Sequence, residues 1–314
     1  MLSNRIYFWN LTNTIILFSL TTTGIVGNFS LFYYYLAYYR ECKLKTIYLI
    51  HIHLISANTL IVLSRGVPHT MAAFGLKQFL NEFGCRLLLY IERVGRSMSI
   101  GTICLLSVLQ TIIISHKEFC CKDPKAKASK YIGCSIGLLW VVHILLHFIF
   151  LVHPIFKWYS NNVTRIRDNG YCSTQGRNEI FDSLYAVLVV CPEILFSLLM
   201  AWSSGYMIVV LYRHKKRVQH IRSTCGFRRN FPESKATHSI LILVCTFLAF
   251  YTLSSILQGC LALLHNHSWW LVNITNLTSL CFSCFGPFVL MNPCSMVPRC
   301  SFYWMRNVNS LFLK

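Results

Sequence analysis

Several residues of this strongly hydrophobic chain have types and spacings that could support chemistry, and the histidines form the first group. Grouped histidines are the ligands of many metal centres. They occur here as three close pairs: His51 with His53, His143 with His147, and His265 with His267. Taken alone, this pattern would be typical of a histidine-box membrane enzyme, provided that the pairs converge on one metal ion.

Charged residues within apolar stretches form the second group. They are Arg65, Glu92, Arg93, Arg96 and Glu193. Ionisable side chains inside a membrane are costly, and each is a functional candidate by default. Glu92 and Arg96 share one helical face at a spacing that allows them to pair, and Arg93 borders that face. Two interpretations stay open: a slightly cationic ligand cavity, or a structural ion-pair network that locks helices together.

The elements that must position these residues are membrane-spanning helices. Only 12% of the 314 residues are charged and 55% are hydrophobic, whereas a soluble domain has about 25% charged residues. The net charge of +19 does not indicate a nucleic-acid partner, because the basic residues lie in short loops between apolar runs. A spanning helix needs about 20 mostly apolar residues. Seven stretches satisfy this: 13–36, 46–67, 85–115, 131–153, 183–211, 237–264 and 269–291.

Lysine and arginine residues predict how these helices are oriented. Most of them lie in the connections after the first, third and fifth spans and in the C-terminal segment. That side is expected to face the cytoplasm. We therefore predict an all-α membrane protein in the plasma membrane. Residues 1–314 would form a single seven-transmembrane helix bundle with the N-terminus outside and the C-terminus in the cytoplasm.

This topology keeps the three histidine pairs apart. One pair falls in the inner part of the second span, one in the outer half of the fourth, and one outside the membrane. The sequence also contains no HExxH, GxSxG or phosphate-binding loop. We therefore predict no enzymatic activity, no metal and no cofactor. A polytopic transporter is the remaining alternative, although no match between two halves of the chain is evident.

The same topology predicts which cysteines and glycosylation sequons lie outside the cell. Cys85 and Cys172 are the two cysteines placed on the outer, oxidising side and outside the spans, so they are expected to pair. Such a bond would hold the second outer loop over the mouth of the bundle. Asn162 lies in that loop and is the favoured glycan acceptor. Cys294 and Cys300 follow the seventh span, and whether they are palmitoylated is left open.

Five runs of the sequence resemble the vomeronasal type-1 receptors, a family of G-protein-coupled receptors. They cover helices two to seven: 64–77 (SRGVPHTMAAFGLK), 93–110 (RVGRSMSIGTICLLSVLQ), 211–221 (LYRHKKRVQHI), 232–247 (PESKATHSILILVCTF) and 287–291 (PFVLM). The third span ends in Gln110, Thr111 and Ile112 instead of an acidic-Arg-aromatic triplet, as is usual for this family. The residues that follow PFVLM depart from the family pattern.

The resemblance implies a pheromone receptor of sensory neurons that is coupled to a heterotrimeric G protein of the inhibitory class. The predicted Cys85–Cys172 bond and the glycan at Asn162 also match the family. A small amphipathic or anionic ligand suits a cavity of this composition. We expect it to enter from outside and to contact Arg65, Glu92, Arg93 and Arg96.

The basic run after the fifth span is the expected G-protein-facing surface. Its side chains could equally contact lipid headgroups and mark the cytoplasmic side. The run consists of Arg213, Lys215, Lys216 and Arg217.

Overall fold

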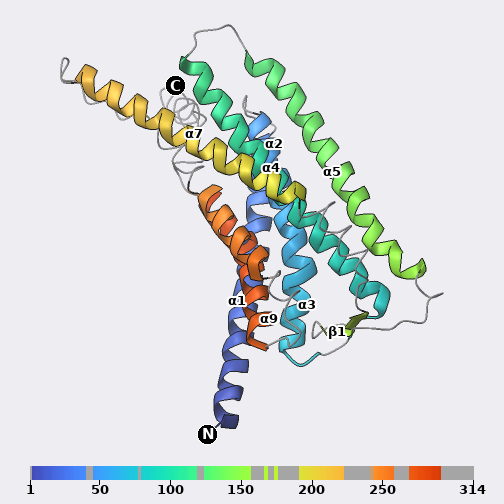
Figure 1. Cartoon of the computed structure of the whole chain (residues 1–314). Coiled ribbons are helices and arrows are strands. Elements are labelled where there is room, and N and C mark those ends of the chain that lie inside the picture. Colours follow the sequence, from blue (N-terminus) through green and yellow to red (C-terminus); the bar gives the residue numbers. More distant parts are fainter. Residues whose placement is uncertain are drawn as a thin grey trace, which may run out of the picture.

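The computed structural model describes residues 2–39, 45–76, 79–118, 124–156, 166–168, 173–175, 191–222, 242, 244–257 and 269–290. Over these ranges the chain is a bundle of long helices (Figure 1). The helices are α1 (Leu2–Tyr39), α2 (Lys45–Ile61), α3 (Val67–Ala73), α4 (Glu82–Glu118), α5 (Pro124–Phe156), α7 (Cys191–Arg222) and α9 (Trp269–Leu290). A further apolar helix, Val244–Leu257, is called the sixth-span helix below.

Each predicted span contains a helix of the structure, and the predicted all-α bundle is confirmed. Leu11–Ala37, Ile47–Ala73, Tyr131–Phe148 and Cys191–Val210 are long and apolar enough to cross a membrane. The helix α4 carries the charged residues of the third span and is less apolar. The β-hairpin of β1 (Ile166–Asp168) and β2 (Ser173–Gln175) is an addition to the predicted elements; its strands are antiparallel, with Ile166 opposite Gln175.

The distribution of apolar and polar side chains indicates that lipid surrounds this fold. Large apolar side chains such as Trp202 (78% exposed) and Leu195 (65% exposed) cover the outside of α7. Polar side chains, in contrast, are buried between helices: Asn28 of α1 donates hydrogen bonds to the carbonyls of Gly24 (2.8 Å) and Ser283 (2.9 Å). This is the distribution expected when lipid replaces water, because a polar group gains most by finding a partner inside the bundle.

The helix α4 is the central element, and it packs against α2, α5 and α7. Its side chains Ile100, Ile103 and Leu106 are fully buried in the main apolar core. Its charged residues are therefore held by neighbours on several sides, which positions them more precisely than an edge helix could.

The helix ends that depart furthest from the predicted spans are the end of α7 and the start of α1. The helix α7 runs on to Arg222, through the basic run that the charge pattern assigns to an inner loop. Its residues after Leu211 are mostly good helix formers and include neither Gly nor Pro, so nothing stops the helix at the membrane surface. The start of α1 likewise precedes its apolar segment and projects beyond the other helices (Figure 1).

The second span continues past Pro68, beyond its predicted end at residue 67. Between α2 and α3 the chain forms a π-helical turn, η1 (Val62–Gly66), and Pro68 lies in the first turn of α3. In an uninterrupted α-helix the Pro68 ring would clash with the carbonyl of Ser64, and that carbonyl would lose its donor. The wider π turn removes the conflict. It also contains Arg65, so it helps to set the direction of that side chain.

The close approach of α2 and α4 at Gly95 supports a first prediction. A Cβ atom at Gly95 would lie 3.0 Å from the backbone carbonyl oxygen of Ala57 and 3.1 Å from a side-chain carbon of Ile61. The carbonyl cannot move aside cheaply, so we expect Gly95→Ala to destabilise the protein by about 1–3 kcal/mol. A lower melting temperature of the purified protein would show this.

Gly137 of α5 is the matched control, because a Cβ atom there would meet nothing within 4 Å. We expect Gly137→Ala to leave the melting temperature unchanged or to raise it slightly. Equal melting temperatures for the Gly95 and Gly137 variants would contradict the tight α2–α4 contact.

Candidate functional site

A buried ion pair joins the second, third and seventh spans near the Cys85 end of the bundle. The guanidinium of Arg65, in η1, pairs with the carboxylate of Glu92 on α4, and both side chains are about 90% buried. Arg65 Nη2 also donates to Asn276 Oδ1 on α9 at 2.9 Å. The Asn276 amide in turn lies 3.3 Å from His69 Nδ1. The hydrogen bond to Asn276 supplements the ion pair on the arginine side, while Arg65 Nε is buried without a hydrogen-bond partner.

Arg96 lies one helical turn further along α4 and faces the sixth-span helix. Its Nη2 donates to Ser255 Oγ at 3.1 Å. Its guanidinium carbon lies 4.8 Å from the centroid of the Tyr251 ring, which is a cation–π contact. Arg96 therefore links the third and sixth spans through a hydroxyl group and an aromatic ring, whereas Arg65 is joined to the carboxylate of Glu92.

Tyr251 extends this contact to α7. Its hydroxyl donates to Glu193 Oε2, and Ser97 Oγ donates to Glu193 Oε1 at 3.4 Å. Ser97 also lies 3.0 Å from His147 Nε2 on α5. A chain of polar contacts therefore crosses four helices. The sequence singles out Glu193 as an intramembrane charge, but Tyr251 carries no signal that distinguishes it from the other tyrosines.

A cavity lies between these helices, and Arg96 and Glu92 line it. Its volume is about 30 Å³, enough for about two water molecules. The wall combines apolar side chains, aromatic rings, hydroxyl groups and the two charges. The lining residues are Ile61, Glu92, Arg96, Ser99, Phe247, Phe250, Tyr251, Ser254, Thr278, Ser279, Phe282 and Ser283.

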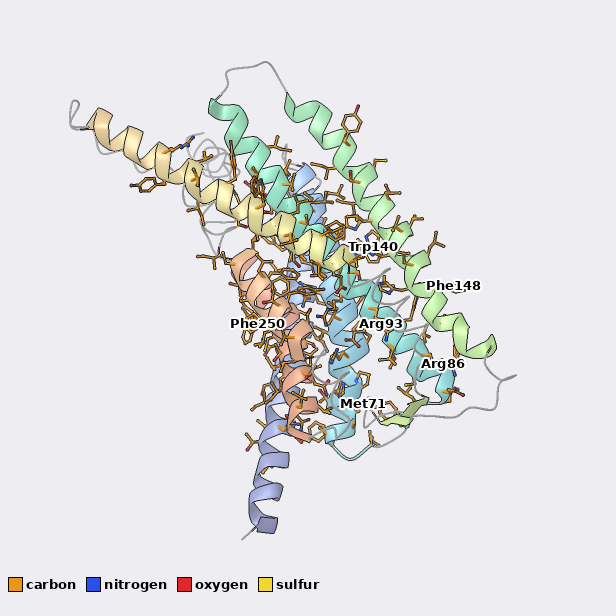
Figure 2. All side chains as sticks on the ribbon, in the orientation of Figure 1. Met71, Arg86, Arg93, Trp140, Phe148 and Phe250 are labelled. Atoms are coloured by element: carbon orange, nitrogen blue, oxygen red, sulfur yellow. The ribbon has the colours of Figure 1, made fainter. Side chains whose placement is uncertain are left out.

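This cavity is too small for a ligand in the present conformation, since ligand pockets usually measure about 300–1,000 Å³. Phe247 and Phe282 meet edge to face across it, with ring centroids 4.5 Å apart. A ligand can enter only if the helices or these rings move. Figure 2 labels Phe250, which lines the cavity from the sixth-span helix, and Arg93 on α4.

The four residues predicted to contact ligand do not all meet at this cavity. Glu92 and Arg96 line it, and Arg65 lies behind Glu92 as its ion-pair partner. Arg93 is not among the lining residues, and it lies near His147 of α5 instead. One step along a helix turns a side chain by about 100°, which separates Arg93 from the face that Glu92 and Arg96 share.

The histidines do not converge within the part of the chain that the structure describes, where no group of three metal-ligating side chains is present. His143 and His147 are stacked on α5, with ring centroids 6.3 Å apart. His53 Nδ1 accepts a hydrogen bond of 3.1 Å from Trp140 Nε1. The pair 265 and 267 lies outside the described residues. The histidines that can be placed thus serve packing and hydrogen bonding between helices.

The remaining predicted sites are placed only in part. Cys85 is buried and disulfide-bonded. Arg213 is exposed on α7, and residues 215–217 continue the same helix. Cys172, Asn162, Cys294 and Cys300 lie outside the described residues, so the pairing of Cys85 with Cys172, the glycan and the palmitoylation stay untested.

Comparison with known proteins identifies the family. The model of the vomeronasal organ pheromone receptor family matches residues 11–302. Human vomeronasal type-1 receptor 4 is 46% identical over 289 residues, which cover 92% of this chain and 96% of the relative. Human vomeronasal type-1 receptor 2 is 47% identical over 269 residues, which cover 85% of this chain and 68% of the relative.

The fold has a known relative as well. The crystal structure of squid rhodopsin superimposes with a TM-score of 0.64 at 15% identity, covering 90% of this chain and 81% of the other. At that identity the likeness concerns the fold alone. The family model spans nearly the whole chain and the sequence relatives are nearly half identical. This chain therefore belongs to the vomeronasal organ pheromone receptor family.

Proposed function

We propose that this chain is a G-protein-coupled pheromone receptor whose ligand is a small amphipathic anion bound at Arg96. The observation that carries the proposal is the guanidinium of Arg96 in the wall of a cavity lined by aromatic rings and hydroxyl groups. An anion placed there would gain charge-assisted hydrogen bonds, which are roughly twice as strong as neutral ones. The rings of Phe247, Phe250 and Phe282 suit an apolar body.

The charges around the cavity support an anionic ligand. Glu92 is compensated by Arg65, because the two form an ion pair. The pair is neutral as a unit, and the Arg96 guanidinium adds a positive charge to the cavity wall. Glu193 faces Tyr251 and Ser97, and Tyr251 stands between it and Arg96.

The family assignment determines the broader class. The relatives are receptors, so this chain is a multi-pass protein of the plasma membrane and not an enzyme. The same assignment decides against the transporter and the histidine-box enzyme. A heterotrimeric G protein and a small-molecule ligand are the partners that such a receptor requires; the inhibitory class of the G protein is part of our proposal.

Ligand binding would have to widen this small cavity, and this suggests how the effect of binding reaches the cytoplasmic side. A ligand shifts an equilibrium only through its different affinities for the two states. An anion at Arg96 favours a state in which the sixth-span helix has moved away from α4 and α7. We propose that the inner ends of the fifth and sixth spans then part. The surface exposed to the G protein would be rimmed by Arg213, Lys215, Lys216 and Arg217.

The proposal also covers the domain organisation, the disulfide bond, the glycan and the lipid contacts of the chain. The chain would be one domain over residues 1–314, with its N-terminus outside. A bond between Cys85 and Cys172 would hold the second outer loop over the ligand entrance, and a glycan at Asn162 would mark the same face. The basic run of α7 would also contact lipid headgroups.

The experiment that tests the proposal is a G-protein activation assay in cells that express the surface-tagged chain. Anionic and neutral amphiphiles are applied in matched pairs. We expect a dose-dependent response to anions that disappears with a toxin specific for inhibitory-class G proteins. Arg96→Ala should weaken the response to the anion by about 10-fold or more, the usual loss for a hydrogen bond to a charged group, at unchanged surface level.

Ser255→Ala is the matched control. It removes the hydroxyl that Arg96 contacts but leaves the guanidinium and the cavity lining in place, so the response should change far less. An unchanged dose–response curve for Arg96→Ala would eliminate Arg96 as the anion contact. A response that survives the toxin would eliminate the inhibitory class.

A further inference from the structure

We infer that the ligand carries a hydrogen-bond donor, such as a hydroxyl group, in addition to its anionic group. This inference rests on the proposed function, because it concerns the cavity that holds Arg96. Two other polar side chains in the cavity wall carry the argument: Ser254 of the sixth-span helix and Thr278 of α9. Both residues are more than 90% buried, so each unmatched polar contact there is costly.

The hydrogen of each hydroxyl is already engaged in a hydrogen bond. Thr278 Oγ1 donates to the backbone carbonyl of Ile274 at 2.8 Å. Ser279 Oγ likewise donates to the carbonyl of Thr275 at 2.8 Å. The hydrogen in the 2.8 Å contact between Ser254 Oγ and Ser279 Oγ must therefore come from Ser254. A hydroxyl has a single hydrogen and two lone pairs, so Ser254 and Thr278 present acceptors to the cavity.

This arrangement distinguishes ligand donors from ligand acceptors. A ligand O–H or N–H can bond to either oxygen while the existing hydrogen bonds persist. An ether or ketone would have to draw a hydrogen away from Ser279 or from the Ile274 carbonyl. An ether or ketone therefore costs the site one existing hydrogen bond. We expect ligands with a donor group to bind roughly two- to tenfold more tightly than ligands with only an acceptor at that position.

The positions of the groups define the class of ligand. Arg96 comes from α4, Ser254 from the sixth-span helix and Thr278 from α9, and the rings of Phe247 and Phe282 complete the same cavity. A molecule that meets all of them has an anionic end, an apolar body and a hydroxyl group. The predicted class is therefore a hydroxylated anionic amphiphile.

The test uses three probes that share one carboxylate and one chain: 12-hydroxydodecanoate, 12-methoxydodecanoate and dodecanoate. Binding to the purified full-length receptor in lipid nanodiscs is measured as the rise in melting temperature with probe concentration. We expect the hydroxy acid to bind roughly two- to tenfold more tightly than the methoxy acid. A methoxy acid that binds as tightly as the hydroxy acid, or more tightly, would overturn the inference.

Variants that remove the Ser254 or Thr278 hydroxyl test whether these two groups cause the preference for the hydroxy acid. Thr278→Val and Ser254→Ala should each reduce the preference for the hydroxy acid, and together they should bring the ratio close to one. Thr275→Val is the matched control: Thr275 is also on α9 and donates to the Leu271 carbonyl at 2.7 Å, but it does not line the cavity. It should leave the ratio unchanged. A ratio that persists in the double variant would overturn the assignment to Ser254 and Thr278.

The anion site and the donor preference fail in different ways. Arg96→Ala should weaken the binding of all three probes equally. If it does so while the hydroxy and methoxy acids bind alike, the anion site stands and the donor preference is wrong. If Arg96→Ala leaves all three affinities unchanged, or if no probe binds, the anion site fails and the inference fails with it.

Discussion

Replacement of Glu92 by alanine is expected to remove most of the receptor from the cell surface. The substitution leaves the Arg65 guanidinium buried without its carboxylate, with Asn276 as a neutral partner. Removing one member of a buried ion pair typically costs about 3–5 kcal/mol, a large share of the roughly 5–15 kcal/mol that stabilises a folded protein. Surface staining of tagged cells and the melting temperature of the purified protein would both report the loss.

The chain offers a matched control and a rescue for this prediction. Glu82 forms an ion pair with Arg86 on the outer surface, where the Glu82 side chain is 59% exposed, so Glu82→Ala should cost no more than about 1 kcal/mol. Apolar side chains of similar volume can replace a buried pair with little loss. Arg65→Met combined with Glu92→Leu should therefore recover surface expression. Equal surface levels for the Glu92 and Glu82 variants would contradict a structural role for the buried pair.

Tyr251→Phe is expected to raise signalling in the absence of ligand. The Tyr251 hydroxyl joins the sixth-span helix to Glu193 of α7, and these two helices are the ones proposed to part on activation. A hydrogen bond to a charged group contributes about 1.5–3 kcal/mol, so its loss would shift the equilibrium toward the open state by roughly 10- to 100-fold. Basal G-protein activity, normalised to surface level, measures the shift.

Two further variants show whether the Tyr251–Glu193 contact itself is responsible. Glu193→Ala should raise basal activity in the same way, and the double variant should not exceed the larger single effect, because both remove one interaction. Thr252→Val removes a side-chain hydrogen bond that stays within the same helix, on its exposed side and away from the cavity, and should leave basal activity unchanged. General damage to the fold would lower signalling. Basal activity at or below wild type in Tyr251→Phe would therefore refute the prediction.

The place of most helices in the chain was predictable because it depends mainly on apolar length. Lipid demands about 20 apolar residues per span, and four of the described helices meet that demand by length and composition. The helix α4 carries charged residues and is not among these four. The ends of the helices were harder to predict. The helix α7 continues through its basic residues because no Gly or Pro stops it, and the second span passes Pro68 because a π turn absorbs the clash.

The partners of the charged residues depend on how each helix is rotated, and the sequence supplies little information on rotation. Spacing suggests that Glu92 pairs with Arg96 on the same helix, whereas its ion-pair partner is Arg65 of η1. Arg93 follows Glu92 directly in the sequence, although it lies near His147 of α5. Tyr251 is not recognisable from the sequence because its role comes from Arg96 and Glu193, which meet it only in the folded bundle.

The π turn at Val62–Gly66 has a consequence for how this receptor tolerates changes in chain length. It holds roughly one residue more than an α-helical turn would, and one residue corresponds to about 100° of rotation. Deleting a single residue there would remove the room that the wide turn gives to the Pro68 ring, so the helix would kink or break beside Arg65. A one-residue indel in this short segment should therefore be more harmful than a longer one in a loop.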